Sequence, residues 1–261
     1  IIPDHIVPNV AKLAPFFDEI ELLLFESEPD QVLPLPYDID RLRELSDQYG
    51  ISYNVHLPLD IRLASKNPDL RHKACDIIFK IFNLFSGLPV TTYTLHLDIP
   101  GELKDKIKTH GLKKDEILFW QDSARSGLTM LCKDLADPGI ISVETLDYPF
   151  EYAEDLVKDF DLSVCIDAGH LIKYGYNLGK IFSDHAAVTP LIHLHGVDFS
   201  KKPAKDHVGL DKLPVNHLET INAILGSYCG VVSIEVFNKD VLNQCLVVLA
   251  GMYKNTPENI E

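Results

Sequence analysis

Short runs of apolar and β-branched residues alternate along the chain with longer segments that have the apolar spacing of amphipathic helices. Two of these helical segments end at a glycine, Gly50 and Gly87, which is a common helix stop. The alternation of strand and helix predicts parallel βα units. The predicted strands are residues 20–25, 53–58, 92–97, 140–144, 162–167, 191–196 and 231–236.

Seven βα units in this order predict an α/β fold of the (β/α)8 TIM-barrel class, with the first strand largely missing from the N-terminus. Ile1 and Ile2 would be the tail of that strand, and residues 8–17 would form the first helix. Because the chain opens at Ile1 rather than at a Met, we expect further residues upstream. A doubly wound open sheet is the alternative, but no GxGxxG or GxxxxGK[ST] motif occurs. No linker-like segment interrupts the alternation, so residues 1–261 are predicted to form a single domain.

His, Asp and Glu residues stand at or near the C-terminal end of six predicted strands in succession. They are His56, His96, Glu144, Asp167, the pair His193 and His195, and Glu235. Because residues two apart on a strand share a face, Glu144 lies on the face of Ser142 and Asp167 on the face of Cys165. Catalytic groups of barrel enzymes occupy this end of the strands. The pattern therefore predicts a cluster of inward-facing functional groups.

Several imidazoles and carboxylates that converge need a cation, because buried carboxylates repel one another. Mn, Zn, Fe or Co suits mixed imidazole and carboxylate ligands, whereas Ca or Mg would favour fewer His residues. His170 ends a D-A-G-H unit just beyond a strand, and His207 lies in the long loop predicted after residues 191–196. The sequence therefore predicts a divalent transition metal as the cofactor.

The net charge of the chain affects which class of partner we expect. With 24 Lys and Arg against 39 Asp and Glu, the formal charge is −15, which disfavours a nucleic-acid partner. The five cysteines are far apart and form no CxxC motif, which is typical of reduced thiols in the cytoplasm. No apolar run reaches the ~18 residues of a membrane span, and no signal peptide is evident. We expect a cytoplasmic protein with a small-molecule substrate and no membrane partner, and leave its oligomeric state open.

The series of strand-end groups, together with the D-x-x-H motif at residues 167–170, resembles the xylose isomerase-like and endonuclease IV-like TIM-barrel superfamily. The resemblance implies that these groups are metal ligands and that Glu144 bridges metals. Two departures favour one or two ions over three. Both His193 and His195 stand where the superfamily usually has one ligand, and its Asp-x-His loop motif reads Lys205-Asp206-His207 here. The implied ligands are His56, His96, Glu144, Asp167, His170, His193, His195 and Glu235, with His207 from the loop.

The opening residues 1–26 and the segment NVHLPLDIRL (54–63) more specifically resemble the cobamide-remodelling phosphodiesterases. This resemblance implies hydrolysis of the nucleotide-loop phosphodiester of a cobamide such as adenosylcobalamin, giving cobinamide phosphate and an α-riboside. A metal would activate water and neutralise the phosphoryl oxygens. The implied catalytic residues are Glu144, Glu235 and His207, and the implied substrate-binding residues are Asp60, Arg62, Asp98 and Lys201.

Three other functions compete with this one. In a sugar or sugar-phosphate isomerase or epimerase of the same superfamily, Glu144 and Glu235 would move a proton across a metal-bound ketose. An abasic-site endonuclease is disfavoured by the charge of −15 and by the absence of a Lys and Arg stripe. A protein that binds a corrinoid or a metal without turnover is the non-enzymatic alternative. The general barrel motifs do not separate the phosphodiesterase from the isomerase.

Overall fold

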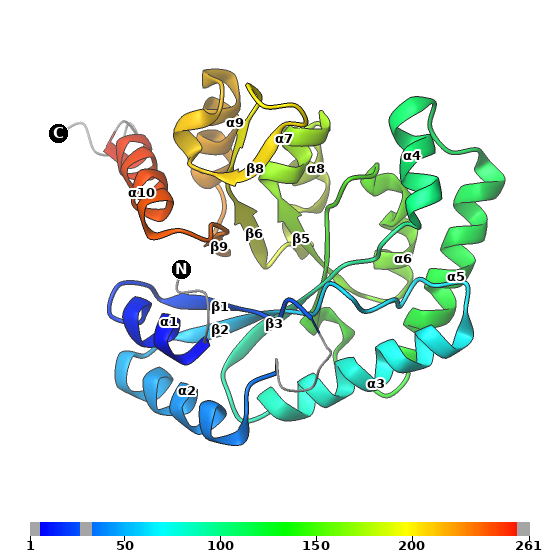
Figure 1. Cartoon of the computed structure of the whole chain (residues 1–261), viewed down its shortest axis with the longest axis horizontal. Coiled ribbons are helices and arrows are strands. Elements are labelled where there is room, and N and C mark those ends of the chain that lie inside the picture. Colours follow the sequence, from blue (N-terminus) through cyan, green and yellow to red (C-terminus); the bar gives the residue numbers. More distant parts are fainter. Residues whose placement is uncertain (1–5, 27–32, 255–261) are drawn as a thin grey trace. The chain divides into compact units, whose positions relative to one another are not determined.

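The first of two compact units ends at Val164 and contains four parallel strands, the first four in the order of a seven-stranded sheet. The computed structural model describes residues 6–26 and 33–254 of the chain (Figure 1). The strands are neighbours in chain order, and their register places His56 beside Thr94 and Thr94 beside Ser142. They are β1 (Glu19–Leu23), β2 (Ser52–His56), β3 (Val90–Leu95) and β4 (Ile141–Glu144).

Several helices of this unit bury an apolar face, whereas α4 has no buried residue among those described. Leu42, Ile78 and Leu128 are fully buried on α2, α3 and α5, of which α2 packs on α3 and α3 on α5. The α-helices are α1 (Ile6–Leu13), α2 (Pro36–Tyr49), α3 (Pro68–Phe85), α4 (Gly101–Thr109), α5 (Lys114–Cys132) and α6 (Glu154–Asp159). Short 3-10 turns are η2 (Pro138–Ile140) and η3 (Phe150–Tyr152).

Local sequence signals fix the helix ends in this unit. Asn67 caps α3, because its side chain accepts a hydrogen bond from the backbone N–H of Asp69 and Pro68 starts the helix. Helix α2 stops at Gly50, whose φ of 70° lies in the left-handed region that glycine adopts without strain. The stop predicted at Gly50 is therefore confirmed. Helix α3 ends at Phe85, two residues before the predicted stop at Gly87.

The second unit runs on from Cys165 and contains the parallel strands β5, β6 and β9, the last three in the order of the seven-stranded sheet. Its register places Asp167 beside His193 and His193 beside Ser233. The strands are β5 (Ser163–Asp167), β6 (Leu191–Leu194) and β9 (Val231–Ile234), and a separate antiparallel hairpin is formed by β7 (Gly196–Asp198) and β8 (Lys205–Val208). The boundary between the units falls inside β5 rather than in a linker, and the single-domain organisation stays a prediction.

Four α-helices cover the second unit. Helix α7 starts directly after β5, because the Asp167 side chain accepts a hydrogen bond from the backbone N–H of His170 and caps it. Leu171, Ile181 and Ile221 are buried on successive helices. The helices are α7 (Ala168–Tyr174), α8 (Leu178–His185), α9 (Val215–Leu225) and α10 (Lys239–Lys254), with 3-10 turns η4 (Ala186–Val188) and η5 (Leu210–Lys212).

Each of the seven predicted strands overlaps an observed one, so the alternating pattern is confirmed. The first helix, predicted at residues 8–17, is observed at Ile6–Leu13. The predicted strand tail at Ile1 and Ile2 lies outside the described residues. The long loop predicted around His207 is instead the β7 and β8 hairpin, because these short strands carry too few residues to show a period. Within residues 6–26 and 33–254, no helix combines the length and apolar character needed to cross a membrane.

Candidate functional site

Three predicted site residues of the first unit meet at the C-terminal ends of adjacent strands, and we call them cluster A: His56, His96 and Glu144. His56 and Glu144 are the last residues of β2 and β4, and His96 follows the last residue of β3. His56 and Glu144 are buried and His96 is partly buried. Because β2, β3 and β4 are parallel neighbours, their ends lie at one edge of the sheet and bring these side chains together.

Both imidazoles of cluster A face the same carboxylate oxygen. His56 Nε2 lies 3.2 Å and His96 Nε2 lies 2.7 Å from Oε2 of Glu144. The Nδ1 atom of His56 donates to the carbonyl of Leu57 at 2.9 Å, so a neutral His56 ring turns its Nε2 lone pair toward the carboxylate. A lone pair and a carboxylate repel each other unless a proton or a metal ion lies between them.

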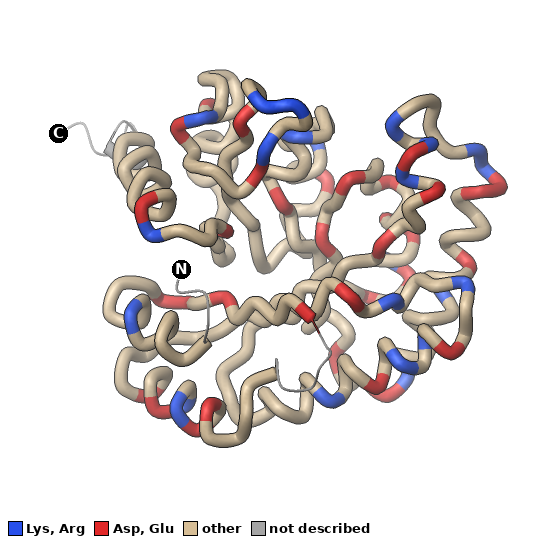
Figure 2. Tube along the Cα trace, viewed as in Figure 1, with Lys and Arg blue, Asp and Glu red and all other residues tan. Residues whose placement is uncertain are grey.

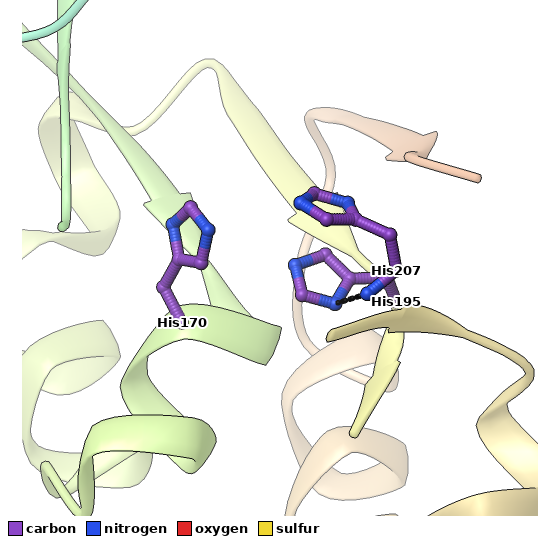
Figure 3. A group of neighbouring side chains, drawn as sticks. All are labelled: His170, His195 and His207. Carbon is purple, nitrogen blue, oxygen red and sulfur yellow. Dashed lines mark hydrogen bonds between the residues drawn. The ribbon is translucent and has the colours of Figure 1, made fainter. Parts of the chain in front are cut away.

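The second unit holds cluster B, which consists of His170, His195 and His207 (Figure 3). Figure 3 shows the three rings facing one another from α7, from the residue after β6 and from β8. Their ring centroids are 5.5 Å apart for His170 and His195, 5.8 Å for His170 and His207, and 4.1 Å for His195 and His207. Their donor nitrogens lie within 4.8 Å of one another.

The Asp167 carboxylate contacts two of the three imidazoles of cluster B. It lies 3.2 Å from Nε2 of His195 and 3.3 Å from Nδ1 of His170, and it is fully buried. The Asp167 side chain also caps the N-terminus of α7, the helix that carries His170. One carboxylate therefore orients two imidazoles and fixes the start of the helix on which one of them sits.

His207 adopts a backbone conformation that is rare for a residue with a side chain. Its φ is 50°, and its backbone N–H donates to Nδ1 of His195 at 3.1 Å, the dashed line of Figure 3. Its own Nδ1 donates to the carbonyl of Glu235 at 3.1 Å, which leaves Nε2 of a neutral ring as an open lone pair. Strained backbone of this kind gathers at functional sites.

The charge states in cluster B differ between neighbours. Burial, and then the neighbouring His195, lower the pKa of His207 to about 4, so this ring is neutral at pH 7. Burial also lowers the pKa of His195, but the Asp167 carboxylate outweighs burial and the net pKa is raised. A neutral imidazole is the form that binds a metal ion.

His193 and Glu235 form the remaining part of the predicted set in this unit. His193 lies inside β6, fully buried, and its Nδ1 is 3.4 Å from Oε2 of Glu235 and 4.0 Å from Oδ2 of Asp167. Glu235 follows β9, and its Oε2 is 3.8 Å from Nδ1 of His207. His195 directly follows β6, and both His193 and His195 lie within 4.0 Å of the Asp167 carboxylate.

The donor sets fit a divalent transition metal. Ligands that share an ion at ~2.1 Å lie roughly 3 to 3.4 Å apart, and the separation of 3.2 Å between His56 and Glu144 meets this requirement. Cluster B offers neutral imidazole nitrogen from His207, and Asp167 and the Glu235 carbonyl supply the outer hydrogen bonds that orient metal-bound His rings. The residues present therefore suit Mn, Zn, Fe or Co, as the sequence predicts.

Asp206 is not part of the ligand groups in the described chain. Its carboxylate instead pairs with Nζ of Lys173 on α7 at 2.6 Å, and both side chains are largely shielded from solvent. The ion pair ties β8, which carries His207, to the helix that carries His170. Sequence reasoning missed it, although Lys173 stands three residues after His170 and so lies near the same helix face.

The predicted substrate-binding residues fall into two groups. Arg62 and Asp98 come together in the first unit, with Arg62 Nη1 3.6 Å from Asp98 Oδ2, in the segments that follow β2 and β3. Asp60 is exposed in the turn before Arg62, and Lys201 is exposed in the turn between β7 and β8. Lys104 was not predicted, yet its Nζ lies 3.3 Å from Asp98 and 2.9 Å from Asp147. It comes from α4, which the sequence pattern did not reveal.

Comparison with known proteins places this geometry in a family. A family model described as xylose isomerase-like TIM barrel matches residues 9–259, across both units. A probable endonuclease 4 from Methanosphaera stadtmanae is 24% identical over 237 residues, which cover 86% of this chain and 78% of that protein. The sequence prediction of this superfamily is therefore confirmed.

Solved structures of the same fold are also similar. A D-tagatose 3-epimerase-like protein has a TM-score of 0.73 at 20% identity, with 94% of this chain and 91% of that chain covered. Endonuclease IV from Thermus thermophilus has a TM-score of 0.62 at 15% identity, with 96% and 94% covered. The predicted TIM-barrel fold class is confirmed by these similarities together with the family match.

Proposed function

Because the chain belongs to the xylose isomerase-like TIM barrel family, we propose that it is a metal-dependent phosphodiesterase acting on cobamides. The bond cleaved would be the nucleotide-loop phosphodiester of a molecule such as adenosylcobalamin, and the products would be cobinamide phosphate and an α-riboside. One observation carries the proposal: clusters A and B are two separate groups of three donors, each able to hold an ion. Phosphodiester cleavage uses more than one ion readily, to activate water and to neutralise the phosphoryl oxygens.

A divalent ion, when bound, would supply Lewis acidity and make a water basic at neutral pH. The chain's own residues have distinct duties in this proposal. Glu144 holds two imidazoles in place through one oxygen, and Asp167 does so through two. Glu235, which is mostly buried beside His193, would accept a proton from the attacking water. Arg62, in the segment after β2, would contact the phosphate.

The named relatives support a phosphodiester substrate, whereas the net charge of this chain opposes a DNA substrate. Two of them are described as endonucleases, and an endonuclease cleaves phosphodiester bonds. The charge of −15 opposes binding to a polyanion, which favours a small phosphodiester instead. The likeness of residues 1–26 and of NVHLPLDIRL to the cobamide-remodelling enzymes supplies the identity of that small substrate.

A second candidate function is a sugar or sugar-phosphate isomerase or epimerase. The observation that favours it is the pairing of each of two strand-end carboxylates with imidazole: Glu144 with His56 and His96, and Glu235 with His193. A carboxylate held in this way can take a proton from one carbon of a metal-bound ketose and return it to the next. The D-tagatose 3-epimerase-like structure carries a name of this class.

Product analysis separates the two candidates. The reduced protein, kept without oxygen, would be incubated with adenosylcobalamin and with Mn, Fe, Co or Zn in turn, and the products identified by mass spectrometry. We expect cobinamide phosphate with at least one metal. The product that retains the phosphate shows which P–O bond is broken, and ¹⁸O-labelled water would confirm attack at phosphorus by placing the label in that product rather than in the alcohol.

Two variants serve as controls for this experiment. Glu144→Gln keeps the size of the side chain but removes the charge at cluster A, so it should abolish turnover. Glu219→Gln removes an exposed carboxylate on α9 and should leave turnover unchanged. Intact corrinoid under every metal, combined with turnover of a sugar phosphate that Glu144→Gln abolishes, would reject the phosphodiesterase in favour of the isomerase.

A further inference from the structure

A large cavity in the first unit is not accounted for by the metal-ligand clusters. Its volume is about 910 Å³, and it is lined by the segment after β2, the segment after β3, and helices α4 and α5. Sites for small molecules range over ~300–1,000 Å³, so this cavity is large enough for a ligand at the upper end of that range. Asp98, which lines it, stands two residues after His96 of cluster A.

One wall of the cavity is apolar and open to solvent. Phe119 on α5 is 60% exposed and Leu70 on α3 is 41% exposed, although both are large apolar side chains. Behind them lie Ile99 and Trp120, which are almost fully buried. Large apolar groups gathered around a hollow surface mark a place where an apolar ligand surface is removed from water.

The polar groups around the cavity are of both signs. Asp98 lies between two cations, with Arg62 Nη1 at 3.6 Å and Lys104 Nζ at 3.3 Å from its two oxygens. Lys104 also pairs with Asp147 at 2.9 Å. Cations and carboxylates that already neutralise one another do not favour a ligand of high charge. They offer hydrogen-bond donors and acceptors side by side, which suits uncharged amide groups.

Two buried aromatic residues hold the segment between cluster A and the cavity. The indole N–H of Trp120 donates to the carbonyl of Asp98 at 3.1 Å, and the hydroxyl of Tyr148 donates to the carbonyl of Leu97 at 2.9 Å. These bonds fix residues 97 and 98, directly after His96. A ligand in the cavity therefore lies against the same short segment that positions a metal ligand.

We infer that this cavity binds the conjugated macrocycle of a corrinoid, with its carboxamide side chains turned toward Asp98, Arg62 and Lys104. The inference rests on the proposed function, since it assigns one half of that substrate to this cavity. Phe119 and Leu70 contact the apolar face of the ring. A carboxamide N–H on this side of the ring donates to Asp98, and a carboxamide C=O accepts from Arg62 or Lys104.

Binding of cobinamide tests the inference without any cleavage. Cobinamide keeps the macrocycle and its amides but has no nucleotide loop, so it requires neither metal nor turnover. Equilibrium dialysis against chelator-treated protein would give its Kd. We expect Phe119→Ala to weaken binding by roughly tenfold, as for removal of a central aromatic contact. Trp120 is the single tryptophan of the chain, so its fluorescence gives a second readout from the cavity wall.

Leu118→Ala is the matched control, because Leu118 is a neighbouring exposed apolar residue of α5 that does not line the cavity. It should bind cobinamide like the parent protein, and thermal unfolding of both variants would show that each is folded. Binding of cobinamide that Phe119→Ala leaves unchanged overturns the inference, as does absence of binding to the parent protein. Binding of an α-riboside that depends on Phe119, in place of cobinamide, also overturns it.

This test and the test of the proposed function fail separately. If cobinamide binds through Phe119 but adenosylcobalamin is never cleaved, the cavity assignment stands and the phosphodiesterase does not. If adenosylcobalamin is cleaved and Phe119→Ala changes neither Kd nor KM, the function stands and the cavity assignment falls. Where both hold, Phe119→Ala should raise KM with little change in kcat.

Discussion

A single glycine makes room for the imidazole of His195. A Cβ atom added at Gly169 would lie 2.0 Å from Cε1 of the His195 ring, which is fully buried and held by Asp167. A separation of 2.0 Å is too short for two carbon atoms, so we predict that Gly169→Ala forces the ring and its surroundings to shift. The expected results are a loss of about 1–3 kcal/mol in the free energy of unfolding, as for overpacking, and weaker metal binding. Thermal unfolding and metal titration would measure them.

Gly179→Ala supplies the comparison for this substitution. The same added atom at Gly179 meets its nearest neighbour, Oδ1 of Asn177, at an ordinary 3.7 Å. Since alanine favours helix over glycine, this variant should be neutral or slightly more stable, and its metal binding should match that of the parent protein. Equal effects of the two substitutions would contradict the role given to Gly169.

The two duties of Asp167, as helix cap and as carboxylate, can be separated by one substitution. In Asp167→Asn the side-chain carbonyl can still accept from the His170 N–H, and Asn caps helices as well as Asp does. The negative charge beside His170 and His195 is lost. We therefore predict little change in the melting temperature of metal-free protein, but a fall of about tenfold or more in metal affinity. Metal content after dialysis would measure the fall.

Asn177→Asp is the reciprocal exchange at the cap of α8, where Asn177 accepts from the Lys180 N–H. It should leave metal affinity unchanged. If Asp167→Asn also retains the metal, the carboxylate is a structural group only and the ligand assignment at this position is wrong.

At the scale of residues, the sequence predicts the positions of side chains on strands better than the positions of side chains on irregular segments. The period of two along a strand places Glu144 and His56 on the inner face from their neighbours alone, and the structure brings them together. No such period exists for His207, whose place depends on a backbone of positive φ and on a hydrogen bond to His195. The pairing of Asp206 with Lys173 likewise depends on a hairpin that local sequence does not encode.

At the scale of elements, the Lys173 and Asp206 ion pair links α7 to β8. Because both side chains are largely shielded from solvent, we expect Lys173→Met and Asp206→Asn to be coupled. A double-mutant cycle on the free energy of unfolding should give roughly 0.5–3 kcal/mol, the range for residues in contact. The cycle would be measured by denaturant unfolding of metal-free protein. The single variants should also weaken metal binding at cluster B, because the hairpin carries His207.

Lys180 and Asp184 provide a control cycle of the same chemistry. They form an exposed pair on α8 at 2.5 Å, one turn apart, and water and salt screen such pairs. Their coupling should be smaller and should not affect metal binding. Equal coupling in the two cycles would show that the Lys173 and Asp206 pair has no special part in holding β8.

Strands and helices differ in how clearly the sequence pattern predicts them, and the differences have physical reasons. Strands that are buried along their whole length, such as β4 and β6, stand out in the sequence as short apolar runs, whereas β1 is buried only at alternate positions. Helix α4 has no buried residue among those described and therefore lacks an apolar face to recognise. Helices α7 and α8 are only seven and eight residues long, too short for a clear period, although the Asp167 cap marks where α7 begins.

At the scale of the whole molecule, the distribution of charge bears on whether this chain binds DNA. Figure 2 shows Asp and Glu positions interspersed with Lys and Arg along helices such as α3 and α5, where a nucleic-acid surface would collect the cations into a stripe. The formal charge of −15 adds a general repulsion of any polyanion. The family contains proteins described as endonucleases, so this difference bears directly on the substrate.

We therefore predict that the protein neither binds nor cuts a DNA duplex that carries an abasic site. Non-specific DNA binding typically has a Kd of ~10⁻⁴–10⁻⁶ M and tightens as salt falls, because bound cations displace counterions from the phosphates. Fluorescence anisotropy of a labelled abasic duplex at low salt should stay flat as protein is added, with each candidate metal present. The same samples, run on a denaturing gel, should show intact strands, whereas an endonuclease that cuts abasic DNA would cleave them. Binding that weakens steeply with added salt, followed by strand cleavage, would mean that a local cationic surface outweighs the net charge, and the substrate would then be DNA rather than a cobamide.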